Sequence, residues 1–278
     1  MKIACGTVIF RHFSLDVALE EIKKAGFEYV ETQATIPFCS HVNPWEDDPE
    51  NYIKKVEDFG FLGTTALWAT DGAIIPNDKS VESITTCLEW AKAANIPIVH
   101  FGDGFKPEDM SLDKAWQITQ ERIHILVEKA KSLQMQLAIE PHGTFSLTKE
   151  GLLKILSLEE STLGINYDAA NIYRSGYVES GGGESQWHSA GTGEDEVDVA
   201  KAIAERIIHF HIKDYIREIN MCVPLGEGGV KNKEVLDALK AVGYQGAISL
   251  ETEGDEDIEV CRSIVIKSKQ YLDNIGVE

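Results

Sequence analysis

The sequence predicts one α/β domain over residues 1–278, a (β/α)8 TIM barrel whose functional site lies at the C-terminal ends of the strands. A chain of 278 residues has the length of one large α/β barrel. Short apolar runs alternate eight times with longer segments of helical period, which is typical of βα units around a parallel sheet. Chemically reactive side chains recur where these apolar runs end, as in barrel active sites. They are Glu31, Trp68, His100, Glu140, His142, Asp168, His211, Lys213, Glu251 and Glu253.

The first four units are expected from apolar runs that each precede a helical stripe. Ser14 is a candidate N-cap for the first helix, which Gly26 should end, and Ser111 is a candidate cap for the fourth. Strands are predicted at residues 2–8, 27–33, 61–69 and 97–101, and the later helices at 50–59, 80–94 and 112–133.

The last four units follow the same order. Strands are predicted at residues 136–140, 163–168, 207–214 and 247–251, and helices at 148–156, 196–206, 232–241 and 258–275. The segment 171–193 is rich in Gly and Ser and contains Trp187 and His188. A loop of that length inside a compact domain is typically functional or disordered.

Composition excludes several classes of partner. With 26 Lys and Arg against 46 Asp and Glu, the net charge of −20 repels nucleic acid and anionic membranes. The five cysteines are scattered without C-x-x-C spacing, which predicts free thiols in a reducing compartment. No apolar run has the length of a signal peptide or a membrane span. We therefore expect a soluble cytoplasmic protein, for which a homo-oligomer is possible.

Strand parity selects four of the reactive residues. Successive strand residues face opposite sides, so Glu140 shares the less apolar face of its strand with Ala138, and Asp168 shares its face with Asn166. Closing the barrel should bring Glu140, Asp168, His211 and Glu251 to one level at the rim. His209, one inward step deeper than His211, should instead fill the barrel interior and form hydrogen bonds there.

Three carboxylates and one imidazole in a semi-enclosed cup call for a cation, because like charges at short range would otherwise force protonation. A divalent ion is the simplest solution. An oxygen-rich set with one His favours Mn²⁺ as the first expectation, with Co²⁺, Mg²⁺, Zn²⁺ or Fe²⁺ as alternatives. The other interpretation makes each acid a helix cap or a solvated loop residue. Four acids and imidazoles at corresponding strand ends favour one metal ion.

Four motifs together resemble the metal-binding regions of the xylose isomerase-like TIM-barrel superfamily, which includes sugar isomerases, ketose 3-epimerases, inosose dehydratases and endonuclease IV. The motifs are residues 139–143, 166–171, 209–214 and 249–251. The resemblance covers nearly the whole chain and is closest in motif to the ketose 3-epimerases. Arg217 stands six positions after His211, as in those enzymes, and residues 226–229 are similar to their glycine-rich turn. Asn171 departs from the pattern, since many relatives have His there.

The resemblance implies a divalent-metal-dependent sugar isomerase or epimerase of carbohydrate metabolism, acting on a ketose or related polyhydroxy carbonyl compound. Glu140 and Glu251 would transfer the proton through an enediolate. Acting on opposite faces of the carbon they would epimerise it, whereas one acting alone would interconvert aldose and ketose. The sugar substrate would be contacted by His142, Arg217, His100, Trp68, His188 and Asn171. Phe101 or Trp187 could also pack against its carbon skeleton.

Three other functions remain open. A dehydratase could use the same metal and base to expel a β-hydroxyl from a keto-polyol such as an inosose. A non-catalytic sugar-binding barrel could keep the metal as a structural pin. An endonuclease IV-type hydrolase would need further histidine ligands and a basic surface, which the net charge of −20 disfavours. Residues 226–229 could approach an anion through backbone amides, although Glu227 lies among them. Lys213 and Asp214 could pair with each other or with the rim.

Overall fold

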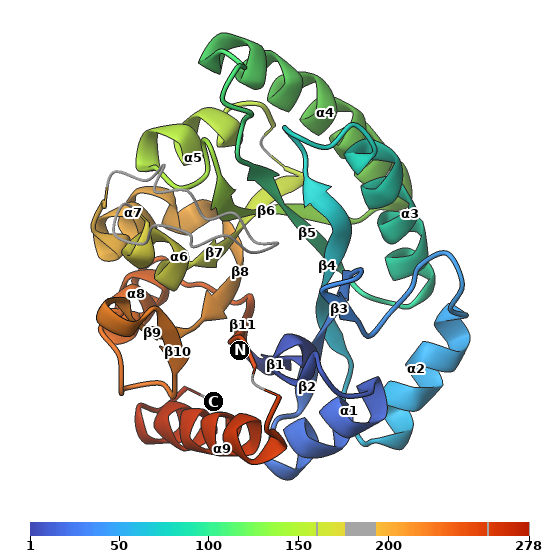
Figure 1. Ribbon diagram of the computed structural model, residues 1–278, viewed down its shortest axis with the longest axis vertical. Helices are drawn as coiled ribbons and strands as arrows, with labels where there is room; N and C mark the ends of the chain where they lie inside the picture. The colour runs from blue at the N-terminus through green and yellow to red at the C-terminus, as the bar shows by residue number, and fades with distance from the viewer. Residues whose placement is uncertain (160, 176–192, 255, 278) are drawn as a thin grey trace.

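The fold is known from a computed structural model, which describes residues 1–159, 161–175, 193–254 and 256–277. Among these residues, eight parallel strands form a closed barrel, because β1 pairs with both β2 and β11. Figure 1 shows the strands at the centre and the helices around them. The barrel strands are β1 (Lys2–Gly6), β2 (Tyr29–Thr35), β4 (Thr64–Ala73), β5 (Ile98–Gly104), β6 (Gln136–Gly143), β7 (Leu163–Asp168), β8 (Ile207–Ile212) and β11 (Ala247–Leu250).

The helices form the outer layer and begin at the residues that local capping chemistry selects. Ser14 and Ser111 accept hydrogen bonds from the first turns of α1 and α4, as the sequence predicts. Arg262 of α9 bonds Glu21 of α1, so the first and last helices lie together. The helices are α1 (Leu15–Lys24), α2 (Pro49–Asp58), α3 (Ser80–Ala93), α4 (Leu112–Leu133), α5 (Lys149–Leu156), α6 (Ala169–Arg174), α7 (Glu196–Ile203), α8 (Asn232–Ala241) and α9 (Ile258–Asn274). None of the described helices is both long and apolar enough to cross a membrane.

The structure adds short elements that the sequence pattern does not predict. Helix α6 occupies the start of the segment expected as a loop, because Asp168 caps it by accepting a hydrogen bond from the Asn171 amide at 2.9 Å. The strand expected at 207–214 ends at Ile212, and a hairpin of β9 (Asp214–Ile216) and β10 (Met221–Val223) follows. Strand β3 (Cys39–Ser40) pairs antiparallel with β2. Strand β1 is shorter than expected, since a 3-10 turn spans Thr7–Phe10.

The apolar core lies mainly between strands and helices, where Leu19, Leu67 and Phe210 are fully buried. Inside the barrel the apolar cluster is small and consists of Ala66, Ile98 and Ala138. The rest of the interior is therefore available to polar side chains. This division explains how a mostly apolar strand such as β8 can carry two histidines on one face.

Candidate metal centre and the polar interior of the barrel

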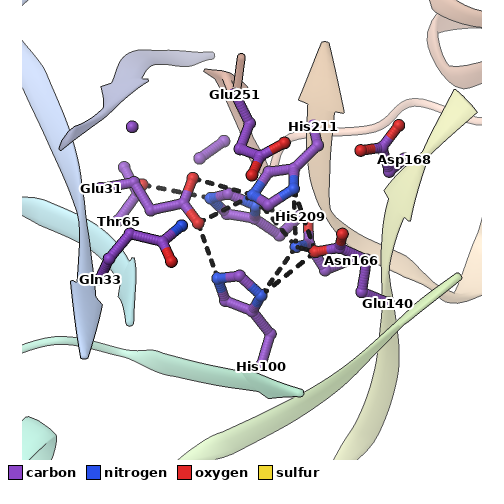
Figure 2. A network of polar contacts seen from close by, with 12 residues as sticks. Glu31, Gln33, Thr65, His100, Glu140, Asn166, Asp168, His209, His211 and Glu251 are labelled. Atoms are coloured by element: carbon purple, nitrogen blue, oxygen red, sulfur yellow. Dashed lines mark hydrogen bonds and ion pairs between the residues drawn. The ribbon is translucent and has the colours of Figure 1, made fainter. Parts of the chain in front are cut away.

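The four residues expected to bind a metal come from four consecutive strands of the barrel. Glu140 lies on β6, Asp168 ends β7, His211 lies on β8, and Glu251 follows β11. The register pairs Asp168 with His211 and His211 with Ser249, two residues before Glu251. Figure 2 shows their side chains directed towards a common interior.

His211 belongs to three groups of side chains that could each hold a metal ion, and two of them include residues of the expected quartet. Its ring lies with Asp168 and Glu251 in one group and with His100 and Glu140 in the other, and in each group the ligand atoms lie within 4.8 Å of one another. Asp168 Oδ2 and Glu251 Oε2 are buried, and among the described residues their polar partner is the ammonium of Lys213. Two such oxygens beside an imidazole are a donor set that fits a divalent cation.

The side chain of Lys213 places a positive charge between Asp168 and Glu251. Its Nζ lies 2.9 Å from Asp168 Oδ2 and 2.5 Å from Glu251 Oε2, and the residue is 2% exposed. Burial opposes the charged form, but the two carboxylates outweigh burial and raise the pKa of Lys213 well above its usual range. The acids at the rim are thus partly neutralised by an ammonium. Charge balance alone does not require a metal ion.

Asp214 faces away from this group and binds the glycine-rich turn. Its carboxylate accepts hydrogen bonds from the backbone amides of Gly226 at 2.9 Å, Gly228 at 3.0 Å and Val230 at 3.1 Å. A Cβ on Gly228 would lie 2.2 Å from Asp214 Oδ1, so the turn needs glycine there. The amides that could have approached an external anion are therefore used by a side chain of the chain itself.

The two glutamates of the quartet lie in different environments. Glu140 Oε2 lies 3.0 Å from Asn166 Nδ2 and 3.1 Å from His211 Nδ1, and Glu140 Oε1 accepts from Asn171 Nδ2 at 3.0 Å. Burial disfavours ionisation of Glu140, but the neighbouring imidazoles outweigh it and lower the pKa of its carboxyl. Burial raises the pKa of Glu251. In acid–base enzymes, two carboxylates whose environments give them different pKa values can take the separate roles of acid and base.

Below the quartet, the barrel interior contains a network of histidines. His209 Nδ1 lies 2.8 Å from Asn166 Oδ1, and Nε2 lies 3.2 Å from Thr65 Oγ1. The prediction that His209 fills the interior and hydrogen-bonds there is confirmed. Glu31 is fully buried and contacts His100 Nε2 at 2.6 Å and His211 Nε2 at 2.8 Å.

Glu31 is the residue that sequence reasoning did not assign to the site. The sequence analysis placed Glu31 among the reactive residues near strand ends, in the predicted strand 27–33, but gave it no role. A carboxylate is buried only with partners. Those partners, His100 and His211, are 69 and 180 residues away along the chain.

The residues expected to contact substrate are distributed around the rim and the interior. His142 is half-buried, with its ring centroid 5.8 Å from that of Trp68, and burial lowers its pKa to about 4. Trp68 also packs edge-on against His100, at 4.7 Å. Both ring nitrogens of His100 contact protein groups, since Nδ1 lies 3.0 Å from Asn166 Nδ2.

Asn171 is buried between Glu140 and Asp168 and orients the first. The Arg217 guanidinium lies over the Tyr173 ring, 3.4 Å from its centroid, and donates to the backbone oxygen of Tyr173. Phe101 is fully buried in the apolar core, which leaves it no surface for substrate. Trp187 and His188 lie outside the described residues.

Comparison with known families agrees with the barrel fold. The family model described as xylose isomerase-like TIM barrel matches residues 19–274. The chain belongs to this family. An uncharacterized protein of Methanocaldococcus jannaschii is 26% identical and covers 99% of this chain, with 91% of its own length matched. An inosose dehydratase of Histophilus somni is 22% identical over 62% of this chain, and the match spans 59% of that enzyme.

Solved structures of this xylose isomerase-like fold superpose over almost the whole chain. A D-tagatose 3-epimerase-like protein gives a TM-score of 0.76 at 20% identity and covers 99% of this chain and 97% of its own. The IOLI protein, solved with a binding zinc atom, also gives 0.76, at 15% identity, with 99% and 98% covered. At these identities the likeness establishes the fold.

Proposed function

We propose that this family member is a divalent-metal-dependent sugar isomerase or epimerase that acts on a ketose or a related polyhydroxy carbonyl compound. The observation that carries the proposal is the pair of buried glutamates, Glu140 and Glu251, on either side of His211 in one polar cup. Proton removal and return next to a carbonyl need two such groups, or one acting twice. Mn²⁺ is the first ion to test, because the donor set is mainly oxygen.

Asp168, His211, Glu140 and Glu251 are the residues that would hold the ion. Bound there, a divalent cation would polarise the substrate carbonyl and acidify the neighbouring C–H. Asn166 and Asn171 fix the Glu140 carboxylate from two sides, at 3.0 Å each, so that its orientation is set before substrate arrives. Among the described residues, Glu251 forms its one ion pair with Lys213, at 2.5 Å.

The proposed division of labour follows from these environments. Glu140, whose pKa is lowered, would be the ionised group that accepts the proton, and Glu251, whose pKa is raised, would return it. His142 and Trp68, which lie side by side at the rim, are the proposed contacts for the sugar hydroxyls and carbon skeleton. Arg217 remains a proposed substrate contact. Asn171 would act on the substrate indirectly, by orienting Glu140.

A dehydratase is the second candidate, and Lys213 favours it. Loss of water from a keto-polyol removes a proton from the carbon next to the carbonyl and a hydroxide from the carbon beyond it. The hydroxide leaves only if a donor protonates it. The Lys213 ammonium, 2.5 Å from Glu251, would hydrogen-bond the departing oxygen, while Glu251, whose pKa is raised, would supply its proton. The inosose dehydratase of Histophilus somni provides an independent reason to test this reaction.

Incubation with a panel of ketoses and inososes in D₂O, with Mn²⁺ added, separates the two candidates. Deuterium at the carbon next to the carbonyl, with the formula otherwise unchanged, is expected for an isomerase or epimerase. Loss of 18 mass units with a new C=C absorbance would support the dehydratase instead. Binding of these compounds without either change would contradict both enzyme proposals and favour a sugar-binding barrel.

A further inference from the structure

We propose that Glu31 is a positioning residue for the metal ligand His211: it holds the Nε2 side of the imidazole and thereby presents Nδ1 to the metal centre. This inference rests on the proposed metal-dependent function and adds a residue to it. Glu31 comes from β2, on the far side of the barrel from β8 in the strand order. Figure 2 shows Glu31 and Glu140 on opposite sides of the His211 ring.

The contacts of Glu31 assign the two ring nitrogens. Glu31 Oε1 and Oε2 lie 2.8 and 3.0 Å from His211 Nε2. An ionised carboxylate only accepts hydrogen bonds, so Nε2 must carry the proton that is shared with it. The other nitrogen, Nδ1, lies 3.1 Å from Glu140 Oε2, on the side of the quartet. Nδ1 is therefore the nitrogen on the side of the quartet, where a cation held with Glu140 would replace the proton that Nδ1 shares with that carboxylate. Asn166 Nδ2 lies 3.1 Å from Nε2 and 3.3 Å from Nδ1, so it does not distinguish the two nitrogens.

Glu31 is itself held in place, as a positioning group must be. His100 Nε2 lies 2.6 Å from Oε1, and the opposite nitrogen of His100 contacts Asn166. The carboxylate is fully buried, a location that is costly unless charged partners surround it. Two imidazoles meet that requirement here. The arrangement is the carboxylate–histidine–metal pattern, in which the outer carboxylate fixes the tautomer and the ring orientation.

An alternative is that Glu31 is itself a ligand, together with His209 and His211, since these three offer atoms within 4.8 Å of one another. The hydrogen bonds disfavour it. Both ring nitrogens of His209 already contact protein groups, Asn166 at 2.8 Å and Thr65 at 3.2 Å. Both oxygens of Glu31 face a ring nitrogen of His211 at hydrogen-bond distance. Glu31 thus acts through His211 and not on the ion.

The test is calorimetric titration of Mn²⁺ into the full chain, comparing wild type with Glu31→Gln. We expect the variant to bind Mn²⁺ about 10- to 100-fold more weakly, the usual loss for such outer carboxylates. Thr65→Val is the matched control, because it removes a buried interior hydrogen bond to His209 instead. It should lower the melting temperature and leave the affinity for Mn²⁺ unchanged. Equal affinities of wild type and Glu31→Gln would overturn the inference.

A second measurement does not depend on any Glu31 variant being folded. In ¹⁵N-histidine-labelled protein loaded with Zn²⁺, with His211 assigned by comparison with His211→Asn, NMR should show Nδ1 bound to the ion and Nε2 protonated. Metal on Nε2, or two ions bound per chain, would contradict the positioning role while leaving the metal-dependent function intact. A wild-type chain that binds no divalent ion would overturn both proposals together.

Discussion

Lys213 places an ammonium between two acids that the fold has buried at the mouth of the barrel. Its two contacts, to Asp168 and Glu251, use the oxygens that a divalent ion would also use. The protein's own cation and the proposed metal therefore share one set of ligands. Removing the ammonium should make the two carboxylates depend on the metal for neutralisation.

Lys213→Met should show this dependence directly. Removing one partner of a buried ion pair typically costs about 3 to 5 kcal/mol, because the remaining charge is left uncompensated. We expect a lower melting temperature in EDTA and a smaller deficit in excess Mn²⁺, both measured by calorimetry. Lys267→Met is the control, since Lys267 pairs with Glu227 on the surface and such pairs contribute little. An equal deficit with and without Mn²⁺ would refute shared ligation.

Glu251→Gln tests the two-glutamate scheme. The amide keeps the size of the side chain but cannot exchange a proton, so turnover should fall by about 10²- to 10⁴-fold or be lost. Circular dichroism should show an intact fold. The exposed Glu227→Gln is the matched control and should keep full activity. Full activity in Glu251→Gln would mean that the scheme is wrong.

At the scale of single residues, the alternation of strand faces predicted which residues point into the barrel. It did not predict which partner a long side chain contacts. It placed Asp168 and His211 on the inner face, and the register pairs them. It left open whether Lys213 faces Asp214 or the rim, because a side chain with four rotatable bonds can do either. The partner of Glu31 depends on closure of the barrel across 180 residues, which no local pattern encodes.

The buried side chain of Asp103, on β5, links that strand to the loop after β6. Asp103 Oδ2 accepts from the amides of Phe145 at 2.5 Å and Ser146 at 3.3 Å, and the Ser146 hydroxyl bonds Oδ1. Ser146 Oγ in turn contacts the His142 amide at 2.7 Å. The contact thus links the end of β5 to the segment that carries His142. Its strength should vary with pH.

Burial raises the pKa of Asp103 to about 6. An unfolded chain releases this proton near pH 4, so between about pH 4 and 6 the folded state binds more protons than the unfolded one. The contribution of Asp103 to the free energy of unfolding should therefore be largest below pH 4 and fall by about 3 kcal/mol as pH rises through 6. Urea unfolding of wild type and Asp103→Asn at pH 4 and pH 7 measures this difference. A difference between them that is independent of pH would contradict it.

Elements with strong periodicity or a local cap were predictable, and short ones were not. Strand β7 and helices α4 and α8 have the predicted bounds, because apolar runs, helical stripes and the Ser111 cap act locally. Strands β9 and β10 are three residues each, too short for alternation to be recognised. Helix α6 begins at its N-cap Asp168, and the sequence analysis considered this residue only as a metal ligand.

At the scale of the whole molecule, stability and metal binding should be coupled. A ligand that binds only the folded state at 100 times its Kd adds about 2.7 kcal/mol. For a chain of this size that corresponds to a rise in melting temperature of roughly 5 to 10 °C. Scanning calorimetry with and without Mn²⁺ gives the shift, and Asp168→Asn should reduce it. No shift with Mn²⁺, Co²⁺ or Zn²⁺ would exclude a tightly bound ion.

The strand order divides the candidate centre between the two halves of the barrel. All four proposed ligands come from β6, β7, β8 and the segment after β11, whereas Glu31 and His100 come from β2 and β5. Recombination between relatives that replaced the first four barrel strands would exchange the outer support of His211 and keep every ligand. Evolution could thus change metal preference or affinity without altering the quartet. A chimaera of two such relatives would take its metal ligands from one parent and the residues that orient His211 from the other.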